Sequence, residues 1–440
     1  MSASFWSIAV SKKFNILLFF IAFIVIYIPF VKNHGVALIN EDSGDFPSFY
    51  FGAKLAFVEK ESPYVPDNLR QAFKEYTGNN GDYFPYLYMP SSLIFFLPFT
   101  WVSYDVARQA MLILNHLFIL LFIYLFLFKV LKTKSSDIFS TLFVLYIFSF
   151  APLYVILDNG QINIFILILI CLTWYFAKEQ KSPWWVALPL SLAIILKLYP
   201  ALLLIPLLFR KQYKAVGYTI FLTLLISGIV TLFLPNGIWD TWYANVGSKG
   251  YAQTVLNLST NAPANQSIYG MLTRTFFGRN VRFAPILVVP GWVSQIAPYG
   301  ISGIVFLFSL FVSFTANRNG SLKSISIPDM DFSLWSIVSF LIAPISWDHH
   351  LLFIVPALAV LIYSLLYLSE RKNYLLLGIS IATALALAIP FPYNSPAFRE
   401  GIKTLLMSTS LYITGLLWLQ VIFYLFSTSR SGNAAKPELG

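Results

Sequence analysis

Long apolar runs separated by short polar segments recur along this chain from residue 14 to residue 426. Each of the longest runs is near the roughly 20 residues that a helix needs to cross the hydrocarbon layer of a bilayer. The runs lack the alternating pattern, about ten residues long, of an outer-membrane barrel strand. The pattern therefore predicts an all-α polytopic membrane protein.

Composition and charge agree with this prediction. The 440 residues are 58% hydrophobic and 11% charged, whereas a soluble domain carries about 25% charged residues. The net charge of +10 does not indicate nucleic-acid binding, because basic residues near the ends of spans orient membrane proteins. The single cysteine, Cys171, excludes an internal disulfide.

The basic residues of the short loops predict the topology. If these loops are cytoplasmic, both termini lie inside and one domain, 1–426, holds about twelve helical segments. Long outer loops are expected at 32–104 and 235–297, and a disordered cytoplasmic tail at 427–440. The segments are expected at 14–31 (a retained helix rather than a cleaved signal), 105–130, 137–156, 162–177, two half-length helices within 184–209, 213–234, 298–316, 331–346, 350–368, 374–390 and 402–426.

Residues 87–102 form a further apolar stretch in the first outer loop. Pro90 and Pro98 interrupt it, and a full span here would invert the charge pattern of the loops that follow. We therefore expect this stretch to dip into the membrane without crossing it.

The polar clusters that could carry chemistry all fall on the predicted outer face. They occupy 41–45, 158–161, 265–267 with Arg274, and 346–350. Ionisable groups gathered at one membrane face indicate an enzyme or a transporter that works at that face.

Asp45 precedes an apolar pattern of helical spacing that begins at Phe46, with Pro47 suited to a first helical turn. The pattern predicts an amphipathic helix on the membrane surface over 46–57, followed by a second helix over 67–77. Asp45 could cap the first helix or accept a proton from a sugar hydroxyl.

Six short motifs, in this order, resemble those of GT-C glycosyltransferases, and most closely those of the bacterial polyprenyl-phosphate-mannose-dependent family 87. They are Asp45 with the helix after it, Pro63-Tyr64 with Leu87-Tyr88-Met89-Pro90, Gly160-Gln161-Ile162-Asn163, Lys197-Leu198-Tyr199-Pro200, Asn265-Gln266-Ser267 with Arg274, and Trp347-Asp348-His349-His350. The resemblance covers about residues 40–360.

The resemblance implies a GT-C fold and a reaction. A hexose, with mannose the first expectation, passes from a polyprenyl-phosphate carrier to a hydroxyl of a lipid or glycan acceptor, with inversion, at the extracytoplasmic face of the cell membrane. Asp45 matches the family's first-loop aspartate, the expected general base, and Asp42 is the fallback.

A lipid-linked phosphate leaves most readily beside positive charge and hydrogen-bond donors. Lys197, Tyr199 and Arg274 are the candidates to bind it. An ionisable residue within an apolar segment usually indicates function, although Lys197 could instead snorkel to the interface and Arg274 could contact lipid headgroups.

His349 and His350 are expected to act in the reaction by hydrogen bonding to phosphate or acceptor. They could alternatively begin a capped helix at Asp348 or bind a metal, but adjacent helical positions point about 100° apart. We expect no metal and no cofactor. Gln161, Asn163, Asn265, Gln266, Tyr88 and Trp347 are the candidates to bind sugar or acceptor, with a polar turn and an interfacial aromatic belt as the alternatives for some of them.

The main alternative is a secondary transporter of a polar or anionic solute. Transporters usually contain internal repeats around a midplane site, and the two halves of this chain share no evident repeat. The cytoplasmic loops also contain no glycine-rich phosphate loop, which argues against a nucleotide-sugar donor. The identities of the sugar and the acceptor stay open.

Overall fold

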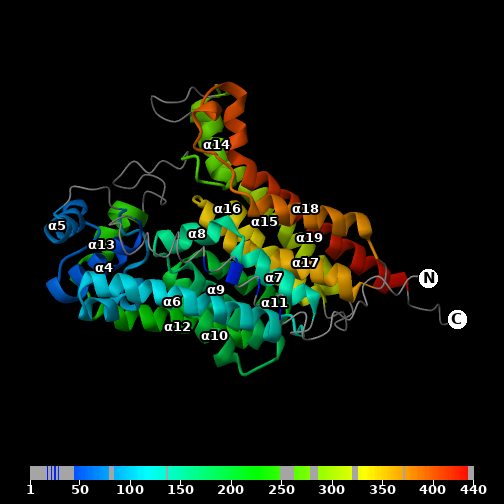
Figure 1. Cartoon of the computed structure of the whole chain (residues 1–440), viewed down its shortest axis with the longest axis horizontal. Helices are drawn as coiled ribbons and strands as arrows, with labels where there is room; N and C mark the ends of the chain where they lie inside the picture. Colours follow the sequence, from blue (N-terminus) through cyan, green and yellow to red (C-terminus); the bar gives the residue numbers. More distant parts are fainter. Residues whose placement is uncertain are drawn as a thin grey trace.

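The computed structural model describes residues 44–78, 84–134, 137–247, 262–277, 286–319, 326–369 and 372–434, and five separate positions between 17 and 28. The predicted first span, 14–31, lies outside the described residues except at those positions. Over the described ranges the chain is helical, without a β-strand beyond the isolated bridge between Asn265 and Trp347. Figure 1 shows the long helices running side by side along the molecule.

Five helices of the described part are long and apolar enough to cross a membrane. They are α6 (Tyr104–Tyr124) with η6 (Leu125–Val130), α12 (Tyr213–Thr231), α15 (Gly291–Asn319), η10 (Asp348–Ile354) with α17 (Val355–Tyr363) and η11 (Ser364–Leu368), and η13 (Gly401–Ser408) with α19 (Thr409–Ala434). The pair α7 (Ile138–Phe148) and α8 (Ala151–Asp158), bent by 50°, is either a broken sixth span or a re-entrant segment. The protein is therefore a multi-pass helical membrane protein.

Several shorter helices complete the bundle. They are α9 (Asn163–Lys178), α10 (Pro183–Leu196), η7 (Tyr199–Leu203) with α11 (Leu204–Phe209), α16 (Ser326–Ile342) and α18 (Tyr374–Ala388). The segment 184–209 contains the expected two short helices. Lys197 breaks the chain between them with extended backbone angles (φ −147°, ψ 138°).

The first loop contains α4 (Phe46–Lys54), η3 (Leu55–Glu59) and α5 (Pro66–Thr77). A helix is present where one was predicted at 46–57, but its predicted place on the membrane surface is wrong. Every residue from Phe46 to Ala53 is buried in the protein. Aromatic side chains occupy several faces of α4 and pack on one another, as in the stacked rings of Phe49 and Phe96, 4.4 Å apart. The helix is thus part of the protein core.

Residues 87–102 form two short 3₁₀ helices, η4 (Pro90–Phe95) and η5 (Leu97–Trp101), instead of one long helix. Together with α4, α5 and α13 (Ile238–Trp242) they belong to one end of the molecule (Figure 1). A hydrogen bond of 2.7 Å between Ser62 and Thr241 ties the first loop to α13.

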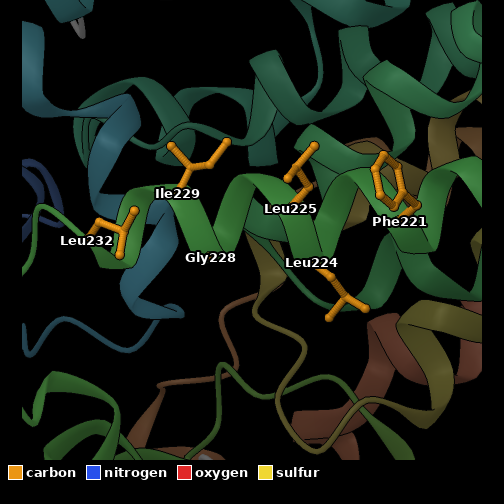
Figure 2. Close-up of a pocket in the computed structure, with 6 residues that line it drawn as sticks. All are labelled: Phe221, Leu224, Leu225, Gly228, Ile229 and Leu232. Atoms are coloured by element: carbon orange, nitrogen blue, oxygen red, sulfur yellow. The ribbon is translucent and has the colours of Figure 1, made fainter.

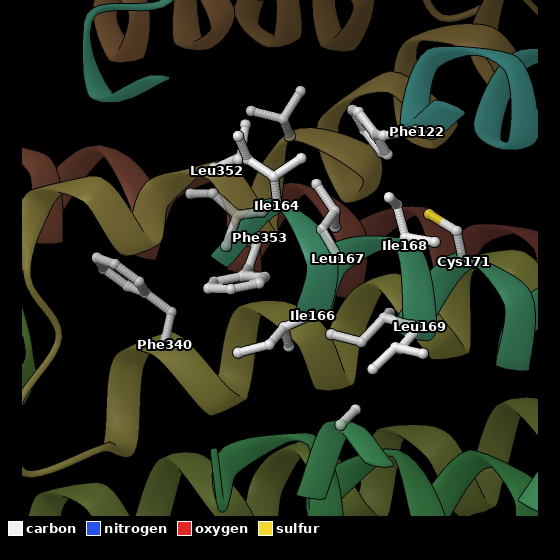
Figure 3. Packing of buried hydrophobic residues seen from close by; sticks show 14 of the residues in the cluster. Phe122, Ile164, Ile166, Leu167, Ile168, Leu169, Cys171, Phe340, Leu352 and Phe353 are labelled. Carbon is white, nitrogen blue, oxygen red and sulfur yellow. The ribbon is translucent and has the colours of Figure 1, made fainter. Parts of the chain in front are cut away.

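Helix α9 lies at the centre of the core (Figure 3). Ile164, Leu167 and Cys171 of α9 are fully buried, and the cluster around them includes Phe122 of α6 and Leu352 of η10. Dense apolar packing of this kind holds neighbouring backbones in one arrangement. It therefore determines where the polar first residue of α9, Asn163, is placed.

The remaining described elements are η8 (Tyr243–Gly247), α14 (Ile268–Phe277) and η12 (Pro396–Phe398). Helix α14 projects from the bundle together with the segment before α19 (Figure 1). After that segment, α19 continues to Ala434. Residues 427–434, predicted to begin a disordered tail, are therefore helical. Residues 435–440 lie outside the described residues.

Candidate active site

Asp45 precedes the first turn of α4, and its carboxylate makes no capping bond to that helix. It accepts a hydrogen bond from Nε2 of Gln161 instead. Gln161 lies in the turn between α8 and α9, so two segments far apart in sequence meet here. The Asp45 side chain is directed toward the second polar cluster and not along its own helix.

Backbone contacts with Asn159 fix the position of Gly44 and Asp45. The amides of Asp45 and Phe46 both donate to the carbonyl oxygen of Asn159, at 2.9 and 3.1 Å. Gly44 has φ +95°, and a Cβ atom there would come within 2.8 Å of Cα of Asn159. A glycine is required both by this backbone conformation and by this close approach.

The surroundings of Asp45 change its acidity. Burial raises the pKa of the Asp45 carboxyl, and the charges of His349 and Lys197 and the hydrogen bond from Gln161 lower it by less, so that the pKa is raised overall. A carboxylate with a raised pKa binds a proton more tightly than one in water. Such a group is suited to general-base chemistry.

Lys197 is the second buried ionisable group, 8% exposed. Its Nζ lies 2.6 Å from Oδ1 of Asn163 and 3.1 Å from Nε2 of His350, and 5.2 Å from the centre of the Tyr88 ring. An ammonium group only donates, so Nε2 of His350 accepts. Burial lowers the pKa of the Lys197 ammonium to about 7, and the charge of Asp45 raises it by less. An anionic ligand beside Lys197 would favour its charged form.

Three polar atoms around this lysine are buried and lack a hydrogen-bond partner among the described residues. They are the hydroxyl of Tyr199, Nδ2 of Asn163 and Nε2 of His349. Leaving such groups unsatisfied in a protein interior is costly and requires an explanation. A polar ligand that reached any of them would supply the missing hydrogen bond.

His349 contacts the carboxylate that precedes it. Nδ1 of His349 lies 3.6 Å from Oδ1 of Asp348, and the ring packs edge-on against His350 with centroids 4.7 Å apart. The other carboxylate oxygen accepts a hydrogen bond from the hydroxyl of Tyr393. Tyr393 comes from the turn after α18.

Two contributing residues escaped the sequence analysis. Asn115, fully buried within α6, donates to the carbonyl oxygen of Gln161 at 3.1 Å. An asparagine inside an apolar span was an available signal. Tyr393 stands in the proline-rich run 390–396, which by itself predicts only a turn.

The motif of the second outer loop takes a different place from the one expected. Asn265 forms a backbone bridge with Trp347, and its side-chain oxygen accepts from the amide of Ser346 at 2.9 Å. Gln266 donates to the carbonyl oxygens of Pro263 and Met407, both at 2.7 Å. These residues support the loop that carries the histidines.

Arg274 is also directed into protein. Its guanidinium donates to the carbonyl oxygens of Ala262 and Asn265, at 2.6 and 2.9 Å, and to the hydroxyl of Ser408 at 2.6 Å. These contacts hold α14 to η13, and the phosphate contact expected for Arg274 stays a prediction. Asp42, the fallback base, lies outside the described residues.

Among the described residues, no three His, Cys, Asp or Glu side chains are grouped so that they could hold a metal ion.

A separate apolar groove runs along α12, lined by Phe221, Leu224, Leu225, Gly228, Ile229 and Leu232 (Figure 2). It carries no polar side chain and has the character of a lipid-facing surface.

The fold and this geometry define a class: a polytopic helical membrane protein with a buried polar cluster that contains an aspartate and a lysine. Residues 86–323 match glycosyltransferase family 87, and the chain belongs to that family. It is therefore a membrane glycosyltransferase. The matched residues include Gln161, Asn163 and Lys197 and end before His349.

Two curated relatives are described as polyprenol-phosphate-mannose-dependent alpha-(1-2)-phosphatidylinositol mannoside mannosyltransferases. The protein from Mycolicibacterium smegmatis is 24% identical over 374 residues, which cover 80% of this chain and 79% of the relative. The protein from Mycobacterium tuberculosis is 25% identical over 315 residues, which cover 68% of this chain and 66% of the relative.

Proposed function

We propose that this chain transfers mannose, with inversion, from polyprenyl-phosphate mannose to a hydroxyl of a lipid or glycan acceptor. The observation that carries the proposal is a buried base, Asp45, beside the lysine–histidine contact of Lys197 and His350. The family and the donor named for both relatives support the mannosyl carrier. Their named acceptor makes a phosphatidylinositol mannoside the first acceptor to test.

In the proposed reaction, the acceptor oxygen forms a bond to the anomeric carbon on the face opposite the phosphate. The bond from that carbon to the phosphate oxygen breaks, and polyprenyl phosphate leaves with the electron pair. Asp45 takes the proton of the acceptor hydroxyl. Its raised pKa suits this step, because a stronger base removes the proton more readily.

The leaving phosphate is assigned to Lys197, Tyr199 and Asn163. The ammonium supplies positive charge, and the phenol hydroxyl and the amide Nδ2 supply donors that are open among the described residues. Charge and donors that already stand in place stabilise the departing oxygen without reorganising. His350 holds Lys197 in position through the 3.1 Å contact.

The sugar and the acceptor are assigned to the other polar groups of the cluster. Gln161 holds Asp45 and, through a 3.5 Å contact, meets the hydroxyl of Tyr88. Nε2 of His349 is open to a ligand hydroxyl. Trp347, Asn265 and Gln266 act by shaping the loop that ends at the histidines.

The proposal also concerns location. The site would face the extracytoplasmic side of the cell membrane, with both termini in the cytoplasm and about twelve segments in one GT-C domain over 1–426. The distribution of basic residues among the loops supports this orientation. A lipid-linked donor would then reach the site from the outer leaflet.

The test is a transfer assay with the purified protein in nanodiscs. Polyprenyl-phosphate mannose and GDP-mannose, both labelled, are offered with phosphatidylinositol mannosides, and with EDTA in a parallel arm. We expect label in a new glycolipid from the polyprenyl donor alone, with or without EDTA. Loss of transfer in EDTA would overturn the metal-free reaction, and solute uptake by proteoliposomes without transfer would overturn the enzyme.

A further inference from the structure

The turn between α18 and η12 brings a tyrosine to the histidine loop. Pro390, Pro392 and Pro396 restrict this segment, and the rings of Phe391 and Phe398 stack across it with centroids 5.3 Å apart. The turn is therefore stiff. Tyr393, at its centre, is held in one place.

The hydroxyl of Tyr393 donates to Oδ2 of Asp348. The other oxygen of this carboxylate, Oδ1, accepts from the backbone amide of His349 at 2.8 Å and faces Nδ1 of the same residue at 3.6 Å. Both carboxylate oxygens are thus engaged. The carboxylate cannot rotate without losing one of these contacts.

The orientation of the His349 ring depends on this carboxylate. The ring is buried, 6% exposed, and Nδ1 and Nε2 lie on different edges of it. With Nδ1 toward Asp348, the opposite edge presents Nε2, which has no hydrogen-bond partner among the described residues. The ring packs against His350, with centroids 4.7 Å apart, and His350 contacts Lys197 at 3.1 Å, which joins the His349 ring to the rest of the site.

We propose that Tyr393 is a positioning residue for the transfer reaction: by its bond to Asp348 it sets the orientation of His349, so that Nε2 of this ring is presented to the substrate. This inference rests on the function proposed above, with Asp45 as the base. Tyr393 follows the residues that match the family. It therefore adds a fifth segment of the chain to the site, after the first loop, the turn before α9, the break at Lys197 and the histidine loop.

The positioning role differs from simple anchoring of the turn in how the loss divides between kcat and KM. Without the tyrosine bond, the Asp348 carboxylate keeps only the bond from the amide of His349, and the His349 ring loses its fixed orientation. Lys197 and Asn163 contact each other without Tyr393, so donor binding should be kept while kcat falls.

The experiment compares Tyr393→Phe, Asp348→Asn and the double variant with wild type in the transfer assay, using polyprenyl-phosphate mannose. Tyr374→Phe, at a tyrosine 70% exposed, is the matched control. We expect Tyr393→Phe to lower kcat by about tenfold or more, the loss typical of a hydrogen bond to a charged group, with little change in the KM for donor. The double variant should be no slower than Asp348→Asn, because both residues act through one contact.

Each outcome decides a different point. Absence of transfer by wild type from any polyprenyl-phosphate sugar would remove the proposed function itself, whereas full turnover by Asp45→Asn would remove only Asp45 as the base. If Asp45→Asn is inactive while Tyr393→Phe keeps the wild-type kcat, the positioning role is overturned. A lower kcat with a raised KM for donor and additive losses in the double variant would reduce Tyr393 to a structural anchor. If Tyr393→Phe does not fold, Asp348→Asn tests the same division between kcat and KM.

Discussion

At the residue scale, the site combines a base and an ammonium group that are both buried. Asp45 is linked to Gln161, and Lys197 is linked to Asn163 and His350. Gln161 and Asn163 are two residues apart, so the turn before α9 connects the two halves of the site. Small displacements of this turn would alter both halves at once.

The pH dependence follows from the acidity of Asp45. Burial raises the pKa of this carboxyl above its usual range, and a base is inactive while it is protonated. We expect the rate of transfer to fall as pH falls through this raised pKa, by about tenfold per pH unit below it. A kcat profile whose acid limb lies at the pKa of a free aspartate would contradict the burial of the base.

Replacing Lys197 by methionine removes the charge and keeps most of the side-chain volume. A hydrogen bond to a charged group is worth about 1.5–3 kcal/mol, so we expect donor affinity to fall by at least tenfold and acceptor affinity to change less. Titration of each substrate separately measures this. Lys403→Met, at an exposed lysine, is the control, and equal effects on both substrates would argue against a phosphate contact.

The sequence selected Lys197 because an ionisable residue in an apolar stretch is conspicuous. Asp45, Gln161, Asn163 and His350 were selected from polar clusters on the predicted outer face and from the resemblance to family 87, and the structure brings these residues together with Lys197. The protein contacts of Arg274 could not be predicted, because a guanidinium in a loop can face a ligand or backbone carbonyls. Tyr393 was missed because nothing in a proline-rich turn shows what its tyrosine contacts.

At the scale of elements, the close approach of two turns determines where Asp45 points. Gly44 and Asn159 belong to those turns, and both adjacent amides of α4 donate to the same carbonyl oxygen. The position of the Asp45 carboxylate therefore depends on how closely the backbones of these two turns pack.

Gly44→Ala tests that dependence. A Cβ at this position would lie 2.8 Å from backbone of Asn159 at φ +95°, so the turns must separate and Asp45 must move. A misplacement of about 1 Å costs about 10²-fold in rate, and we expect at least that loss of kcat.

Gly78→Ala is the matched control, because Gly78 also has positive φ (+69°) but has nothing within 4 Å of the added atom. It shares the backbone strain without the collision. Equal activity of the two variants would show that the approach of the turns does not position the base.

The presence of short helices was easier to predict than whether a helix would be buried in the protein. The short helices around Lys197 followed from counting residues between two basic loops. The burial of α4 did not follow, because a helix with aromatic residues on several faces still shows an apolar stripe. Whether such a helix rests on lipid or on protein depends on segments elsewhere in the chain.

At the scale of the whole molecule, a buried ion pair joins the central helix α9 to α16. Nζ of Lys178 lies 2.7 Å from Oδ2 of Asp329 and 2.8 Å from the carbonyl oxygen of Val130. The indole of Trp174 donates to the other carboxylate oxygen at 2.8 Å. These contacts connect helices from both halves of the chain.

Asp329→Asn should therefore destabilise the protein as a whole. Removing one partner of a buried pair leaves an uncompensated charge and costs about 3–5 kcal/mol. Unfolding in detergent measures the loss, and Asp67→Asn, at a side chain 86% exposed, is the control. The double variant Lys178→Met with Asp329→Asn should lose less than the sum of the single changes, and strict additivity would contradict the pair.

The most direct test of the account is Asp45→Asn, measured for transfer and for donor binding in the same preparation. Asparagine keeps the size of the side chain and cannot accept the proton. We predict that transfer falls by about 10²-fold or more while the protein stays folded and binds polyprenyl-phosphate mannose. Full turnover by this variant would remove Asp45 from the mechanism and turn attention to Asp42.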